Sequence, residues 1–186
     1  MAATSATNVF AKECILTALR ALMKEKEFEE ISITDITRKA GVSRMAYYRN
    51  YKSKKDIIVK SLEENAVKTD QYAIPIFESG DMKAYIECLF TGFAQMSDFY
   101  ASLQRANLGD MILRYFNRCL IRFMARYTDP EPRKYEILAF SGAIYNMAIT
   151  WIMEGLRETP GEMAQKYLAA MDVNLLYRVY AAREVP

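Results

Sequence analysis

Residues 32–58 read SITDITRKAGVSRMAYYRNYKSKKDII, and the spacing of their polar residues decides how this part of the chain folds. Ser32 and Asp35 resemble a capping box, which predicts that a helix begins after Ser32. Gly41 supplies the left-handed residue that ends such a helix, and Ser43 is placed to cap a second short helix. Two short helices joined by a glycine turn indicate a helix-turn-helix motif.

Helices are also expected on both sides of this motif. Ser53 and Asp56 repeat the capping pattern and predict a longer helix. This helix is expected to end near Asp70, because Pro75 disfavours a helical conformation at the residue before it. Upstream, the apolar spacing in residues 9–26 predicts an amphipathic helix of about five turns.

The rest of the chain shows helical periodicity and no strand pattern or repeat. Further helices are expected at residues 81–103, 108–127, 133–154 and 160–182. The fold class is therefore all-α, with eight helices, or nine if Gly109 separates a short one. The expected domains are a helix-turn-helix head at 1–52, a connecting helix at 53–74 and a larger ligand-binding and dimerisation domain at 75–186.

The composition excludes several classes of enzyme. The chain of 186 residues contains no histidine, which removes His-based nucleophilic sites, His general bases and His-containing zinc sites. Its seven glycines lie at least six residues apart, so no glycine-rich nucleotide loop is present. Three widely separated cysteines form no disulfide framework and indicate reduced thiols of a cytoplasmic protein. We expect no catalytic residue, no metal and no cofactor.

One uncharged stretch, residues 137–153, requires comparison with a membrane span. Its 17 residues fall short of the roughly 20 that a span needs, and they include Ser141, Gly142, Asn146 and Thr150. A helix buried in protein or at an interface is the favoured interpretation, so no membrane partner is expected.

Positive charge is concentrated in the helix-turn-helix region. Residues 38–55 contain seven lysines and arginines, no acidic residue and three tyrosines, although the whole chain carries a net charge of only +2. Basic residues interleaved with aromatic ones are typical of phosphate-backbone binding, although a solvated basic face has the same appearance.

The motif as a whole resembles the DNA-binding signature of TetR/AcrR-type transcriptional regulators. The matching pieces are Asp35-Ile36, Ala40-Gly41-Val42-Ser43, Tyr47-Tyr48, Tyr51 where the family usually has Phe, and Ser53-Lys54 before Ile57. The resemblance covers about residues 9–65. Glu27 departs from the family, which commonly has a glycine there. Trp151-Ile-Met-Glu-Gly155, followed by Pro160 and Met163, resembles the last two helices of some members.

The resemblance implies a cytoplasmic homodimer that binds a near-palindromic double-stranded DNA operator. A small-molecule effector, apolar or aromatic, is then expected to bind the C-terminal domain and to release the DNA, as in a repressor. Two alternatives are a protein of the same fold that acts through a protein partner and has a vestigial pocket, and a helical enzyme that uses carboxylates such as Glu87 or Glu154. No paired acidic motif supports the enzyme.

Candidate DNA contacts come from the helix-turn-helix. Arg44 is placed to read a guanine and Tyr48 to contact a phosphate, while Tyr47 and Tyr51 are expected to pack inside the head. For Arg49, Asn50 and Lys52, a solvated basic surface is an equal alternative. The full set of candidates is Ser32, Thr34, Ser43, Arg44, Met45, Tyr48, Arg49, Asn50, Lys52 and Lys54.

Candidate pocket and interface residues come from helical stripes in the C-terminal half. The stripes consist of apolar side chains, which either line a ligand pocket or form plain core. The pocket candidates are Phe93, Met96, Tyr100, Met111, Tyr115, Met147 and Trp151, with Gln95, Gln104 and Asn146 as polar groups. Gly142 lies in an uncharged helix and either allows a partner subunit to approach or packs within its own subunit. The dimer candidates are Gly142, Ala143, Met163, Tyr167, Met171 and Leu175.

Overall fold

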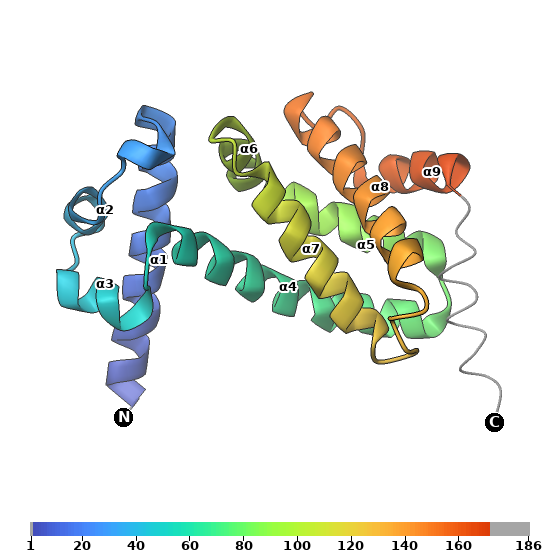
Figure 1. The fold of residues 1–186 in the computed structure, drawn as a ribbon, viewed down its shortest axis with the longest axis horizontal. Coiled ribbons are helices and arrows are strands. Elements are labelled where there is room, and N and C mark those ends of the chain that lie inside the picture. The colour runs from blue at the N-terminus through green and yellow to red at the C-terminus, as the bar shows by residue number, and fades with distance from the viewer. Residues whose placement is uncertain (1, 172–186) are drawn as a thin grey trace. The chain divides into compact units, whose positions relative to one another are not determined.

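The computed structural model describes residues 2–171, with side chains from Thr7 onward. It contains nine α-helices, one short 3-10 helix and no strand within these residues (Figure 1). The all-α prediction is therefore confirmed. The helices are α1 (Ala2–Glu25), α2 (Ile33–Ala40), α3 (Arg44–Asn50), α4 (Lys54–Ser79), α5 (Met82–Gln95), α6 (Ser97–Arg105), α7 (Gly109–Met124), α8 (Lys134–Met153) and α9 (Pro160–Ala170), with the 3-10 helix η1 at Phe28–Glu30.

The chain forms two compact units whose boundary lies between Glu64 and Asn65, inside α4. In the first unit α1 packs against α2 and α3. Its core contains the predicted apolar side chains of α1 together with one residue each from α2 and α3. These fully or almost fully buried side chains are Ile15, Leu19, Leu22, Ile36 and Tyr47.

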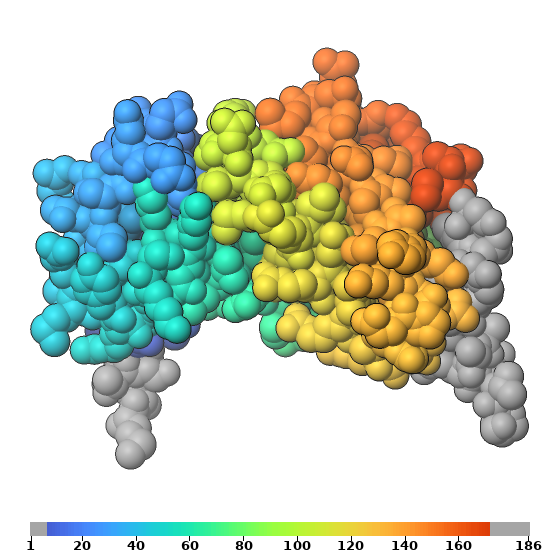
Figure 2. Space-filling model, viewed as in Figure 1, coloured from blue at the N-terminus to red at the C-terminus, as the bar shows by residue number. Residues whose placement is uncertain are grey.

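Three aromatic rings form the centre of the second unit. Phe77 from α4 lies 5.2 Å from Tyr85 of α5 and 5.1 Å from Phe123 of α7, measured between ring centroids. Helix α5 also packs against α8 and α9, and α7 packs against α8. Figure 2 shows the side chains of α7 and α8 meeting along one face of this unit.

Helix α4 extends further than the sequence predicted. It passes through Pro75 and ends at Ser79 rather than near Asp70. Pro75 leaves the carbonyl of Gln71 without its helical donor, but both residues are exposed, so water can solvate that carbonyl. The complete burial of Phe77 stabilises the turn beyond the proline. Tertiary packing therefore overrides the local effect of the proline.

Two other helix boundaries also differ from the prediction. The ninth helix arises from a break at Met96, which separates α5 from α6, whereas Gly109 is the first residue of α7. Helix α9 begins with the predicted capping box, in which Thr159 and Glu162 bond each other's backbone N–H groups. It ends at Ala170 because Met171 is extended, and the rest of the range 160–182 lies outside the described residues.

Helix α8 is the one described helix that is long and apolar enough to cross a membrane by length and composition alone. Half of its most apolar window is buried inside the protein. The buried half includes Ile137, Ile144 and Ala148, each fully buried. These contacts are those of a core helix in a helical domain.

Candidate nucleic-acid interface

Helix α3 separates its residues into an inner and an outer face. Its N-cap is Ser43, whose hydroxyl accepts a hydrogen bond from the Ala46 N–H at 3.1 Å. Tyr47 is fully buried, and its ring packs against Tyr51. With Tyr47 inside, the helical period places four residues on the outer face, namely Arg44, Met45, Tyr48 and Arg49, and all four are exposed.

Burial of Tyr47 also shapes the position of Tyr48. The two rings meet edge to face at 5.3 Å between centroids, and 53% of Tyr48 remains exposed. Burial raises the pKa of Tyr47 to about 12. The sequence prediction that Tyr47 and Tyr51 pack inside the head agrees with their burial, and Tyr48 is left to present its hydroxyl to solvent.

The turn before α2 is held by the carboxylate of Asp35. It accepts hydrogen bonds from the Ser32 N–H at 3.0 Å and the Ser32 hydroxyl at 2.8 Å, and from Lys26 at 2.7 Å. The bond from Lys26, followed by those from Ser32, holds the pKa of Asp35 well below its usual range. Gly41 then ends α2 with a φ of 65°, the left-handed conformation that the sequence predicted. Ser32 and Thr34 are both exposed at this end of α2.

The cations of the basic run fall into two groups. Arg38 pairs with Asp35 at 3.1 Å, and Lys39 pairs with Glu25 at 2.6 Å. In contrast, four exposed cations form no ion pair with any residue between 7 and 171, namely Arg44, Arg49, Lys52 and Lys55. An unpaired exposed cation is available to a phosphate at no cost of a broken ion pair. Lys55 was not among the predicted contacts, although its place in the basic run was a signal for it.

Lys54 is not placed as the sequence predicted. Its ammonium donates to the carbonyls of Phe28 at 2.5 Å, Glu29 at 2.8 Å and Ile31 at 3.1 Å. It also lies 4.6 Å from the centre of the Phe28 ring, and its side chain is 19% exposed. All three ammonium donors are therefore occupied by η1 and by Ile31, the residue that follows it. Lys54 joins that segment to α4 and is not available to bind phosphate.

Asn50 is also withdrawn from the surface. It is 6% exposed, and its amide donates to the Asn8 side chain and to the Ala46 carbonyl, both at 2.9 Å. Lys60 of α4 donates to the Asn50 carbonyl at 2.5 Å. Asn50 thus connects α3 to α1 and α4, which corrects its predicted role as a DNA contact. Neither Asn8 nor Lys60 was predicted, because long-range partners leave no local pattern.

The predicted pocket residues do not come together around either of the two hollows described here. Phe93, Tyr100, Tyr115 and Trp151 are core side chains, 3–8% exposed, whereas Met96, Met111 and Met147 are half-buried. Among the polar candidates, Gln95 lines a second hollow, described below, whereas Gln104 and Asn146 do not. Met147 and Trp151 instead lie with Asn146 beside a hollow of about 350 Å³ between α8 and α9.

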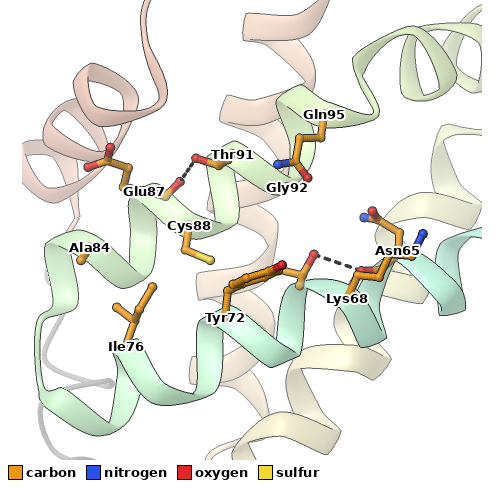
Figure 3. Close-up of a pocket in the computed structure, with 11 residues that line it drawn as sticks. Asn65, Lys68, Tyr72, Ile76, Ala84, Glu87, Cys88, Thr91, Gly92 and Gln95 are labelled. Atoms are coloured by element: carbon orange, nitrogen blue, oxygen red, sulfur yellow. Dashed lines mark hydrogen bonds between the residues drawn. The ribbon is translucent and has the colours of Figure 1, made fainter.

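The larger hollow is a groove between α4 and α5, with a volume of about 540 Å³ (Figure 3). Sequence reasoning missed it because its residues come from two helices and form no apolar stripe. Its lining residues are Asn65, Lys68, Thr69, Tyr72, Ile76, Ala84, Glu87, Cys88, Thr91, Gly92 and Gln95. All of them belong to the second unit.

The predicted dimer residues also divide into two groups. Met163 and Tyr167 are 5% and 1% exposed, and Tyr167 packs on Phe140 at 5.6 Å between centroids, so their own subunit buries both. Gly142 and Ala143 are half-buried on α8, and a Cβ added at Gly142 would meet no atom within 4 Å. Met171 is half-buried, and Leu175 lies outside the described residues.

The described residues hold no cluster of three or more cysteine, aspartate or glutamate side chains that suits a metal ion. What the first unit offers is a helix-turn-helix whose second helix presents unpaired cations and a tyrosine. This arrangement defines the class of helix-turn-helix DNA-binding proteins.

Comparison with known proteins gives a family match for the first unit. Residues 15–60 match the family described as bacterial regulatory proteins, tetR family. The match confirms the resemblance found in the sequence, and it covers the helix-turn-helix with parts of the helices on either side. A comparison with curated proteins gives no match.

Two solved structures are similar over most of the chain. One is the dihydroxyacetone kinase operon activator DhaS, with a TM-score of 0.56 and 16% identity over 91% of this chain and 96% of that chain. The other is the transcriptional regulator FadR from Bacillus subtilis in complex with stearoyl-CoA, with a TM-score of 0.48 and 16% identity over 84% of this chain and 95% of that chain. The likeness to DhaS extends the fold assignment to the second unit.

We expect Lys54→Met to affect the stability of the protein and Lys55→Met to affect its DNA binding. Lys54→Met removes one donor from each of three backbone carbonyls and should lower the free energy of unfolding by about 1–3 kcal/mol. Lys55→Met should change that free energy by less than about 0.5 kcal/mol and should make DNA affinity less dependent on salt. Urea unfolding and duplex titrations at several salt concentrations measure both. A stable Lys54→Met protein with a shallower salt dependence would show that Lys54 contacts phosphate after all.

Asp35 should make the head sensitive to acid. Its pKa is lower in the folded state than in the unfolded chain, where it is about 4. The stabilisation is therefore fully present above about pH 5 and is lost as the pH falls toward 2. Asp35→Asn should unfold at lower urea than the wild type at pH 7, and the difference should shrink on acidification. Glu30→Gln, at an exposed residue of the same unit, is the control and should follow the wild type at every pH.

Proposed function

We propose that this protein is a homodimeric, cytoplasmic repressor that binds a near-palindromic DNA operator and releases it on binding a small molecule. The observation that carries the proposal is the outer face of α3, where two unpaired arginines flank an exposed tyrosine. The TetR-family match of residues 15–60 supports DNA as the partner. The family and the structural neighbours are transcriptional regulators rather than enzymes, so we propose no catalytic activity.

In this proposal α3 is the recognition helix and enters the major groove with its N-terminus first. Arg44 and Met45 then occupy the first turn, where side chains of a recognition helix contact base edges. Arg44 donates two hydrogen bonds to a guanine, and Tyr48 donates to a phosphate one turn later. Arg49, Lys52 and Lys55 supply charge to the backbone. Ser32, Thr34 and Ser43 remain proposed contacts at the helix starts, while Asn50 and Lys54 are excluded by their contacts within the head.

A dimer is proposed because one head recognises too few base pairs to find a site in a genome. The exposed face of α8 is the proposed interface. It contains no charged residue between positions 137 and 153, and it follows the helical repeat through Ala139, Gly142, Asn146 and Met153. The space above Gly142 would let a second copy of α8 approach closely. Water would otherwise cover this uncharged face over four turns of helix.

The proposal of release by an effector is supported by the second unit, which offers a groove of about 540 Å³. Pockets for small organic ligands commonly enclose about 300–1,000 Å³. A reporter gene under the selected operator tests the direction of control. Expression should rise when the protein is removed, and a fall would make the protein an activator.

Arg44→Ala should relax the base preference at one position of each half-site and weaken binding by about 1–3 kcal/mol per half-site. Selection from random duplexes, followed by sequencing, measures the preference of each variant. Arg38→Ala is the matched control, because Arg38 is an exposed arginine of the same unit that is paired with Asp35. It should return the wild-type sequence preference. Identical preferences for Arg44→Ala and the wild type would remove Arg44 from the base contacts.

Gly142→Arg should give a folded monomer that binds its operator weakly although all DNA-contacting residues are intact. The arginine has room in a single subunit, but in the dimer its charge would be desolvated without a partner. Light scattering coupled to size exclusion gives the mass, and circular dichroism shows whether the helices remain. Gln71→Arg, on an exposed position of α4, is the control and should remain dimeric. A Gly142→Arg dimer would place the interface elsewhere.

A further inference from the structure

The groove between α4 and α5 is organised around one close contact. A Cβ added at Gly92 of α5 would lie 3.3 Å from the Thr69 hydroxyl oxygen of α4, so the two helices approach closely there. The Thr69 hydroxyl is itself bonded to the Asn65 carbonyl at 3.1 Å, which leaves it no role as a free donor to a ligand. Recognition in the groove therefore depends on the side chains on either side of this contact (Figure 3).

Apolar surface occupies the middle of the groove. Tyr72 is 69% exposed, and Figure 3 shows its ring lying between the two helices below Cys88. Burial raises the pKa of the Cys88 thiol, so this side chain stays protonated and neutral at physiological pH. Ile76 and Ala84 continue the apolar surface toward one end. A flat or aliphatic group would cover the exposed ring of Tyr72 and lose its own hydration.

The opposite end of the groove carries positive charge. Figure 3 shows Asn65, Lys68 and Gln95 together at this end. Lys68 is exposed and forms no ion pair with any residue between 7 and 171. The Asn65 side chain lies near the buried hydroxyl of Tyr100. An ammonium and the exposed amide of Gln95 are donors that suit an acidic group.

The acidic residue of the lining does not neutralise this end. The Glu87 carboxylate lies 3.4 Å from the position of a Cβ added at Gly161, in the first turn of α9. A carboxylate at the start of a helix is stabilised by the helix dipole. In Figure 3 it points away from Tyr72 and from the Lys68 end. Charge in the groove is therefore polarised, with the cation beside the apolar surface.

We propose that this groove binds an amphipathic organic anion, with its apolar part on Tyr72 and its acidic group on Lys68. This inference rests on the proposed function, because it assigns a chemical class to the effector. The groove is suited to such a role since Lys68 and Tyr72 belong to α4, the helix that begins at Lys54 in the first unit. An occupant of the groove thus contacts the helix whose first turns belong to the DNA-binding head.

The test uses the full-length protein and two fluorescent probes that differ in charge. The anionic probe is 1-anilinonaphthalene-8-sulfonate, and the neutral probe is N-phenyl-1-naphthylamine, which lacks the sulfonate. Lys68→Gln should weaken binding of the anionic probe about tenfold and leave the neutral probe unchanged. Lys83→Gln, at an exposed lysine of α5 that does not line the groove, should bind both probes as the wild type does.

A second variant tests the apolar part of the site. Ala84→Trp should fill the Ile76 end of the groove and weaken both probes, while circular dichroism shows that the helices are retained. Equal binding of the anionic probe by Lys68→Gln and the wild type would overturn the proposal. Equal weakening by Lys68→Gln and Lys83→Gln would also overturn it, because it would reveal only the overall charge of the protein.

DNA binding in the same samples separates this inference from the proposed function. Saturating anionic probe should lower the affinity of the wild type for its selected duplex and should have about tenfold less potency on Lys68→Gln. Binding to the duplex without any Lys68-dependent probe binding would overturn the groove proposal and leave DNA recognition intact. Lys68-dependent probe binding with no effect on DNA affinity would overturn the effector role. Lys68-dependent probe binding by a protein that selects no duplex would overturn the proposed function itself.

Discussion

The burial of Tyr47 is the constraint on which the proposed DNA-binding surface depends. Helix α3 has only seven residues and too few turns to be stable alone, so its orientation is set by what it buries. The burial of Tyr47 and the bond from Asn50 to α1 together fix the rotation of the helix about its axis. That rotation places Arg44 and Tyr48 in solvent. A core contact thus determines which side chains face a partner.

The cations of the head are of two kinds: some are bonded to groups of the head itself, and others remain exposed to solvent. Lys26 and Lys39 neutralise carboxylates of the head, and Lys54 is occupied by three backbone carbonyls. Arg44 and Lys55 have no such partner between residues 7 and 171, and both are exposed. Surface ion pairs contribute little to stability. The distribution of paired and exposed cations therefore matters more for the proposed site of DNA binding than for the stability of the head.

Helix α4 gives the second unit both its core and its groove. Phe77 enters the aromatic centre, while Tyr72 and Lys68 remain on the side that faces α5 without being covered by it. This is possible because the helix continues past Pro75 and keeps a single helical phase from Lys68 to Phe77. A helix that ended at Asp70 would have provided neither the ring at 72 nor the anchor at 77. Gly92 then sets how closely α5 approaches.

The sequence by itself determined the features that depend on neighbours in the chain. The capping boxes at Ser32 and Thr159 and the left-handed Gly41 were all predictable, because each needs only partners within about four residues. Tertiary structure alone decided the fate of Lys54, whose three carbonyl partners lie 23 to 26 residues away, and of Asn50, whose amide bonds Asn8 at a separation of 42 residues. It also decided that Tyr167 packs within its own subunit while Gly142 faces open space. Two lysines adjacent in the sequence, Lys54 and Lys55, have the same local pattern, and only the chain packed against α4 makes one structural and leaves the other exposed.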